Sequence, residues 1–407
     1  MIKRINREVL LRFGSSRCLL VILFVLLLQV LHIVESNAME QEMNRTINMK
    51  TYQDIQGWED VERYWDEMDR ELGEFMPEFS LQDAWQDGME EGILSGIKGL
   101  FNGLARYFMN ELVINIKLLG QLILLSVVSA LLKNLQSAFQ SEEVARLTEA
   151  IAFMVLLGLA LGSFSLAVKI GKNAVEEMVG FMFALLPVLL TLLASLGHIT
   201  SVSLFHPLII FSVNMMAKIV NEVIFPLIYF STILFLASHF SPQLKVNRLA
   251  ELFKDISIWS LGFMLTLFTG LTAIQGIAGS VGDALTLRTA KFITGSFIPV
   301  VGKMLADAVE TVLGYSILLK NGATIAGLIT LSLIVTFPLV KLLILIFIYK
   351  FAGALVQPIG ETSLGEALNT MGNCLAIIFA AVATVALVFF IGVSIIAGAS
   401  NAAVMLR

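Results

Sequence analysis

The sequence predicts an all-α polytopic integral membrane protein with a small acidic extracytoplasmic segment near its N-terminus. Two stretches, residues 178–217 and 367–406, carry no Asp, Glu, Lys or Arg over forty positions each. A helix of about 20 apolar residues crosses a bilayer, so the first stretch alone is long enough for two crossings. The composition agrees, with 57% hydrophobic and 14% charged residues, whereas an ordinary soluble domain has about 25% charged residues.

The charge is distributed unevenly along the chain. Residues 39–98 hold 16 acidic and 5 basic side chains, whereas residues 99–407 hold 14 acidic and 17 basic ones. The net charge of −5 therefore comes from one segment. No basic patch points to nucleic acid.

Residues 1–38 have the pattern of a secretory signal peptide. A basic region is followed by an apolar core from Cys18 to Val34 and by the small residues Ser36 and Ala38. This pattern predicts cleavage after Ala38, with an uncleaved signal anchor as the alternative. In both cases the positive-inside rule places residue 39 onward on the extracytoplasmic side.

The acidic extracytoplasmic segment, residues 39–98, contains a helical pattern over 56–76. Its apolar residues recur at spacings of three and four and are Trp58, Val61, Trp65, Met68, Leu72 and Phe75. Pro77 ends this helix, and a second short helix is expected from Leu81 to Gly92. Sixty residues form a poor core by themselves. The helix is thus expected to pack within a small domain, on the membrane domain, or on a partner in the same compartment.

Residues 99–111 form a glycine-spaced amphipathic segment suited to the membrane interface. The polytopic membrane domain, residues 112–407, follows. Eight spans are expected, at about 112–132, 150–168, 178–197, 202–217, 223–240, 256–275, 322–348 and 374–398. Polar or glycine-containing turns are expected between them, including Gly171-Lys172-Asn173 and Gly197-His198.

Residues 276–320 do not fit this scheme, because glycines and several charged residues interrupt an otherwise apolar segment around Pro299. The segment is expected to be a re-entrant or broken helix, or a ninth charged span. Eight spans would leave the C-terminus outside the cytoplasm and nine would leave it inside. The basic residues do not decide between the two.

Two clusters of polar residues interrupt the apolar spans. The first is Asn214, Lys218, Asn221 and Glu222, in which Lys218 and Glu222 are four residues apart and one helical turn can pair them. The second is Lys303, Asp307 and Glu310, which share one helical face. An ionisable group at mid-bilayer costs at least about 2.5–3.5 kcal/mol. These clusters therefore line a translocation path or face another subunit, or else they are an interfacial ion pair and a surface helix.

Lys341 stands alone among Leu and Ile, and it either extends to the interface or pairs with one of these acids. The chain has no nucleotide-binding loop, HExxH or GxSxG motif, and no cysteine–histidine cluster for a metal. We therefore expect no enzymatic activity, no cofactor and no metal site.

Two stretches carry a resemblance to a known family. Leu118–Phe139 reads LLGQLILLSVVSALLKNLQSAF and Lys291–Val312 reads KFITGSFIPVVGKMLADAVETV. With the signal sequence, the acidic segment and the later spans, they make the chain resemble the stage III sporulation protein AE family of endospore-forming bacteria. The resemblance covers essentially the whole chain and is best from about 90 to 400.

The resemblance implies a multispanning subunit in the mother-cell membrane that surrounds the forespore. The implied partners are the other stage III A proteins, namely ring-forming subunits, a secretion-like ATPase and small membrane subunits, with an indirect forespore membrane partner. The implied complex acts as a channel that sustains late forespore development. No catalytic residues are established for the family.

The main hypothesis is thus a membrane scaffold or channel subunit of a trans-envelope sporulation complex. The alternative is a secondary transporter or permease of a small solute, with residues 214–222 and 303–310 at its binding site. A membrane enzyme is a third, weaker option. Neither the solute, the stoichiometry nor the pore-lining face follows from the sequence.

Overall fold

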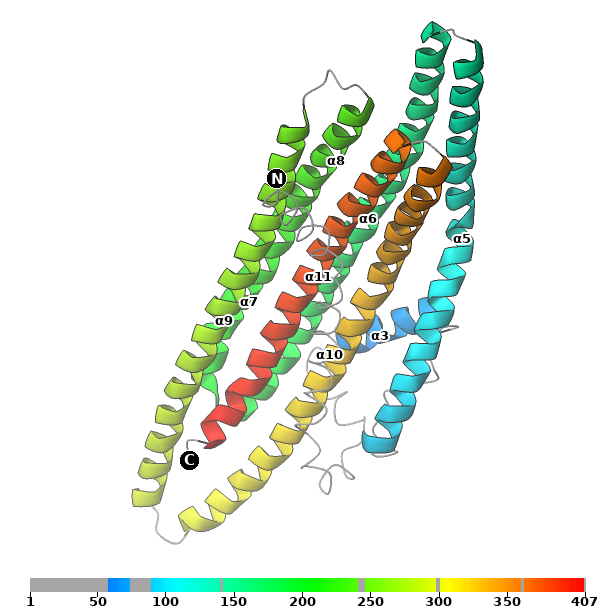
Figure 1. Ribbon diagram of the computed structural model, residues 1–407. Coiled ribbons are helices and arrows are strands. Elements are labelled where there is room, and N and C mark those ends of the chain that lie inside the picture. The colour runs from blue at the N-terminus through cyan, green and yellow to red at the C-terminus, as the bar shows by residue number, and fades with distance from the viewer. Residues whose placement is uncertain are drawn as a thin grey trace, which may run out of the picture.

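A computed structural model of the chain describes residues 58–73, 89–139, 142–240, 246–297, 301–359 and 362–405. The described residues are all helical apart from short connections (Figure 1). Besides the short α3 (Trp58–Leu72), they form the long helices α5 (Met89–Phe139), α6 (Glu142–Ser195), α9 (Asn247–Phe297), α10 (Val301–Val356) and α11 (Thr362–Met405). One further rod consists of α7 (Ile199–Ile219), the π-helical turn η3 (Val220–Ile224) and α8 (Phe225–Phe240). A 3₁₀ turn, η4 (Gln357–Ile359), follows α10.

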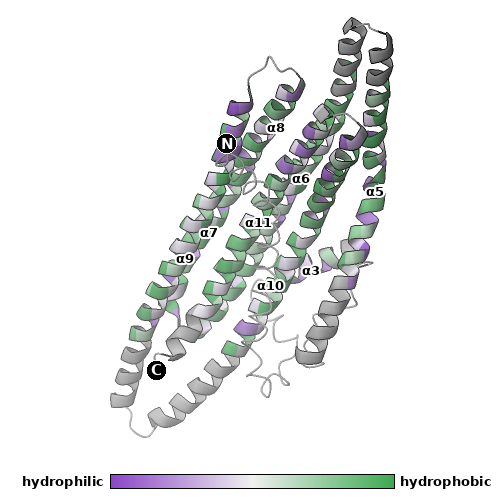
Figure 2. Cartoon of the chain, viewed as in Figure 1, coloured by the Kyte–Doolittle hydropathy of each residue, from purple (hydrophilic) through white to green (hydrophobic). Residues whose placement is uncertain are grey.

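Six helical segments in the described residues are long and apolar enough to cross a membrane. They are Asn102–Leu131, Met154–Ser195, Ile199–His239, Asn247–Thr286, Leu319–Val356 and Ser363–Gly398. Figure 2 shows hydrophobic residues along most of the described length of these helices. The prediction of a helical polytopic membrane protein is therefore confirmed, but the count of eight or nine spans is wrong for the described residues.

The first error in the count lies in α6, where the expected turn at Gly171-Lys172-Asn173 does not form. Gly171 lies inside the continuous helix α6, where it is packed against two other helices rather than located in a loop. A Cβ atom at Gly171 would lie 2.9 Å from Phe225 Cζ on α8 and 3.1 Å from Ile378 Cγ2 on α11. The glycine therefore permits close helix contact, and the expected spans 150–168 and 178–197 are parts of one helix.

The second error lies in the rod α7–η3–α8, which joins the expected spans 202–217 and 223–240. Pro226 has no N–H group to donate to the carbonyl of Glu222, and its ring would clash with that carbonyl in a regular helix. The wider π turn just before Pro226 relieves this conflict, and the Phe225 N–H donates to the Val220 carbonyl instead. The chain thus passes the proline without leaving the helical path.

The other boundaries also differ from the predictions because the helices are longer. Residues 99–111 lie within the continuous helix α5, and their position at the membrane interface stays a prediction. Residues 276–297 continue α9 rather than forming a separate re-entrant element. Pro299 lies outside the described residues, as do residues 1–57.

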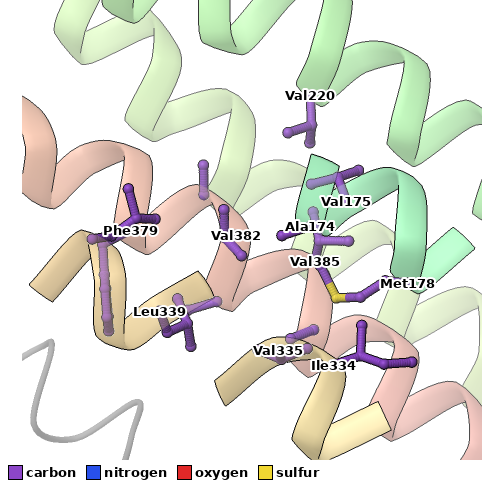
Figure 3. Close-up of a cluster of buried hydrophobic side chains, with 14 of the residues drawn as sticks. Ala174, Val175, Met178, Val220, Ile334, Val335, Leu339, Phe379, Val382 and Val385 are labelled. Atoms are coloured by element: carbon purple, nitrogen blue, oxygen red, sulfur yellow. The ribbon is translucent and has the colours of Figure 1, made fainter. Parts of the chain in front are cut away.

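The core of the bundle is centred on α11, which packs against α6, α9 and α10. Figure 3 shows side chains from α6, η3, α10 and α11 meeting in this core, with Met178, Val220 and Val385 among them. Among the described residues, α11 contributes no large exposed apolar side chain. Side chains of α11 therefore fill the centre of the helical bundle formed by one chain.

Candidate functional site

The described polar side chains with structural or functional roles lie in four places. These are the turn between α6 and α7, the contact between α10 and α11 at Lys320, the outer face of α7, and the acidic helix α3. Each is built differently. The face of α7 presents polar groups to the outside of a membrane-spanning segment, as do Lys117 of α5 and Lys169 and Glu176 of α6.

The turn between α6 and α7 is held by Asp283 of α9. Gly197 supplies the left-handed backbone conformation that reverses the chain, with φ of 82°. Asp283 is fully buried. It accepts hydrogen bonds from the backbone N–H of Thr200 (2.8 Å) and of Ser201 (3.3 Å), and from the Ser201 hydroxyl (2.5 Å).

His198 completes this cluster, with its Nδ1 3.1 Å from Asp283 Oδ2. Asp283 thus caps the first turn of α7 from another helix, a role that a local Ser or Asp usually fills. Its carboxylate also meets the positive end of the α7 dipole. Every described contact of Asp283 is therefore a structural one.

The glycines before Asp283 make this approach possible. A Cβ at Gly279 would lie 2.5 Å from Ser201 Oγ, and one at Gly282 would lie 2.6 Å from Thr200 Cγ2. The sequence shows glycines at every third position, Gly276, Gly279 and Gly282. It does not show that Gly279 and Gly282 allow α9 to approach α7 closely. Asp283 was missed because its partners lie about 80 residues earlier in the chain.

A buried lysine on α10 was also missed. Lys320 is 1% exposed and donates a hydrogen bond from Nζ to the carbonyl of Ala397 on α11, at 2.6 Å. The bond ties the two helices together near one end of their apolar segments. Its signal in the sequence was weak, because Lys320 lies at the edge of a charge-free run.

The first predicted polar cluster lies on the outside of the bundle. Asn214, Lys218 and Glu222 are exposed, and no ion pair joins Lys218 to Glu222 among the described contacts. Asn214 donates from Nδ2 to the carbonyl of Ile210 (3.0 Å). Asn221 is partly buried, and its Oδ1 has no hydrogen-bond partner in the described structure.

The other predicted site residues do not join this cluster in the described structure. Lys341 is partly buried on α10. Lys303, Asp307 and Glu310 belong to the first turns of α10, but their side chains lie outside the described ones. Ala38 lies outside the described residues.

The acidic helix α3 packs on the membrane domain, which was one of the expected arrangements. Its apolar face is buried at Trp58, Val61 and Met68, and it contacts α6 and α10. The ring of Tyr64 meets Phe181 of α6 edge-on, with centroids 5.6 Å apart. This burial raises the pKa of Tyr64 above its usual value.

A glycine of α6 makes room for that tyrosine. A Cβ at Gly180 would overlap the Tyr64 hydroxyl. The opposite face of α3 carries exposed charged residues, among them Glu59, Asp66 and Glu67. Docking thus leaves the acidic face open to other molecules.

These features define a helical, multi-pass membrane protein whose bundle carries a docked acidic helix. Residues 79–400 match the model of the stage III sporulation protein AE family. The chain is also 40% identical over 350 residues to Stage III sporulation protein AE of Bacillus subtilis (strain 168), covering 85% of this chain and 87% of that protein. No solved structure matches the chain. The chain therefore belongs to the stage III sporulation protein AE family, as the resemblance implied, and it has a role in the stage III sporulation complex.

Proposed function

We propose that this chain is a membrane scaffold or channel subunit of a trans-envelope sporulation complex that links the mother cell and the forespore. The length of the helices is the observation that carries this proposal. At 1.5 Å per residue, helices of 51 to 56 residues are about 75–85 Å long. A bilayer with its headgroups is about 40–45 Å thick. Each of these helices therefore extends about 30 Å or more beyond the membrane as a rigid surface for other subunits.

Because side chains fill the centre of the bundle, the structure supports a channel between neighbouring subunits rather than a channel through a single chain. Side chains of α11 such as Ala381, Val385 and Phe389 are buried along the axis of the bundle. A channel would therefore be formed between subunits. The transporter alternative gains no support, because Lys218 and Glu222 face outward rather than into a cavity of the chain.

The proposed place of action is the mother-cell membrane around the forespore, with α3 on the extracytoplasmic side. There the acidic face of α3 can be reached by ring-forming subunits in the space between the two membranes. The energy would come from a separate ATPase subunit, since the sequence has no nucleotide-binding motif. We propose no enzymatic activity for the chain.

Photocrosslinking in sporulating cells tests this proposal. A photoreactive residue at Glu67, on the exposed face of α3, is expected to capture other stage III A subunits. The same residue at Tyr64, which faces α6, is the matched control and is expected to capture none. Absence of any captured subunit at Glu67, together with solute uptake by the purified chain in liposomes, would instead support the transporter.

A further inference from the structure

Helix α9 fixes the depth of the bilayer on one side of the bundle. Its long charge-free run covers residues 256–282. The exposed residues Arg248, Glu251 and Asp255 precede this run, and Asp283 follows it. About 20 apolar residues cross the bilayer core, and each charged group within the core costs at least about 2.5–3.5 kcal/mol. The bilayer core therefore meets α9 within residues 256–282.

The surface formed by α7 and α9 is apolar at this depth. Ser201 of α7 lies against Gly279 of α9. Residues 199–217 of α7, which carry no Asp, Glu, Lys or Arg, therefore run beside the charge-free run of α9. Large apolar side chains on both helices are exposed, among them Phe211, Phe263 and Ile274. We define α7 and α9 over this depth as the apolar side, and its side chains suit contact with lipid.

The acidic helix α3 lies at the same depth on another side of the bundle. It packs on α6 and α10 and crosses the bundle between its two ends (Figure 1). Tyr64 of α3 rests on α6 at Gly180, which precedes the turn at Gly197 by about 25 Å of helix. Asp283 of α9 contacts the same turn. The same distance back along α9 leads to the region of Thr266, near the centre of the charge-free run.

Acidic groups therefore lie at membrane depth on the side of α3. The exposed ones on α3 include Glu59, Asp66 and Glu67. Glu176 and Glu177 of α6 are also exposed, and they lie one helical turn before the residues of α6 on which α3 rests. We define α3 together with these two glutamates as the acidic side.

Two other placements of the bilayer do not remove this conflict. A bilayer moved toward the α8–α9 connection would leave α3 outside, but it would place the exposed Arg248, Glu251 and Asp255 of α9 in the core. A tilt of the bundle that brings α3 to the membrane surface would carry Glu176 and Glu177 toward the middle of the core instead. Acidic groups thus remain at the depth where α7 and α9 meet lipid.

We propose that the acidic side faces a water-filled channel between neighbouring subunits, whereas the apolar side faces lipid. This inference rests on the proposed role as a channel subunit and assigns the face that lines the channel. Ionised side chains at membrane depth face protein or a water-filled cavity rather than lipid, and the centre of this chain is filled by side chains of α11. Because residue 39 onward is expected outside the cytoplasm, the channel opens to the extracytoplasmic side and α3 stays reachable from there. A lining of carboxylates favours the passage of cations over anions.

Reaction of engineered cysteines with a water-soluble maleimide tests this assignment. The full chain, with Cys18 and Cys374 changed to Ser, is studied in broken membranes of sporulating cells that contain the other stage III A subunits. Asp66→Cys on the acidic side is expected to react like Arg248→Cys, which is exposed beyond the charge-free run. Ile274→Cys is the matched control, because Ile274 is exposed on α9 within the charge-free run. It is expected to react at least about tenfold more slowly, since hydrocarbon excludes the reagent and disfavours the thiolate that reacts.

The same maleimide attached to a folded protein distinguishes a channel from an open surface. The attached protein should slow the reaction several-fold more at Asp66→Cys than at Arg248→Cys, because a channel excludes it. Equal rates at Asp66→Cys and Ile274→Cys, or an equal effect of the attached protein at Asp66→Cys and Arg248→Cys, would overturn the proposal. An unreactive Asp66→Cys, together with stage III A subunits captured at Glu67, would leave the scaffold standing and overturn the channel lining alone.

Discussion

The buried carboxylate of Asp283 should be among the most sensitive positions of the fold. Replacing it by Ala leaves the backbone N–H groups of Thr200 and Ser201 and the ring of His198 without their described acceptor. A buried donor left without a partner costs about 1–3 kcal/mol, and removal of a helix cap costs about 0.5–2 kcal/mol. Because the Ser201 hydroxyl can rotate and the backbone can adjust, we expect a total loss of about 3–5 kcal/mol, as for other broken buried charge networks.

Denaturation of the purified chain in detergent micelles, followed by circular dichroism, measures this loss. Asp283→Asn should lie between the wild type and Asp283→Ala, because the amide keeps one acceptor oxygen. Asp255→Ala on the same helix is the control. Asp255 is exposed, and its carboxylate is 4.0 Å from Lys254 Nζ, which makes this ion pair weak. The loss of stability in Asp255→Ala should therefore be within about 0.5 kcal/mol.

Hydrogen exchange locates the effect. Loss of the cap should accelerate exchange at the amides of Thr200 and Ser201 more than at the centre of α11. If Asp283→Ala and Asp255→Ala were equally stable, or if exchange at these two amides were unchanged, Asp283 would not be the cap of α7 and the argument would fail.

Three further predictions use the same kinds of contact. Gly279→Val should destabilise the bundle by about 1–3 kcal/mol, because a side chain at this position meets Ser201. Gly270→Val is the control and should cost much less, because a side chain at residue 270 enters open space. Thermal melting in detergent compares the two variants. Gly180→Leu should displace α3 by occupying the place of the Tyr64 hydroxyl, so proteolysis of the α3 segment should become faster, and unchanged proteolysis would contradict the docking. Cys374 is buried, so in a chain with Cys18→Ser a maleimide should label it only after denaturation, and rapid labelling of that folded chain would contradict the packing of α11.

The sequence predicted the membrane class and the buried face of α3 because both depend on local patterns. A charge-free run predicts a membrane-spanning helix wherever the run lies, and spacings of three and four predict a helical face. Trp58, Val61 and Met68 are buried as that pattern required. The turn at Gly197 was also predicted correctly, because a glycine followed by a polar residue is typical of a helix end.

The count of spans failed because polar residues inside a long helix resemble a turn in the sequence. Lys169, Asn173 and Glu176 of α6 are exposed, and their backbone groups are bonded within the helix as elsewhere. A sequence window cannot distinguish an exposed charge on a continuous helix from a charge in a loop. The role of Asp283 failed to appear for a different reason, since it depends on a contact between α9 and α7 that no local pattern encodes.

The number of helices has a consequence for the C-terminus. In the described residues, α5, α6, the rod α7–η3–α8, α9, α10 and α11 alternate in direction, so the start of α5 and the end of α11 lie at the same end of the bundle (Figure 1). At the other end lies the connection between α8 and α9, with Arg248 exposed beside it. Basic residues in short connections favour the cytoplasmic side. We therefore expect the α8–α9 connection in the cytoplasm and the end of α11 outside it, on the same side as the acidic segment before α5.

Topology reporters fused to the full chain can decide this point. A periplasmic-type phosphatase placed after Arg407 is expected to be active, and the same enzyme inserted at residue 244 is expected to be inactive. A fluorescent protein that folds only in the cytoplasm should give the opposite pattern at the two positions. An active phosphatase at residue 244 would reverse the whole orientation. An inactive one at both positions would mean that an even number of crossings separates residue 244 from the C-terminus, which the three helices α9, α10 and α11 do not allow.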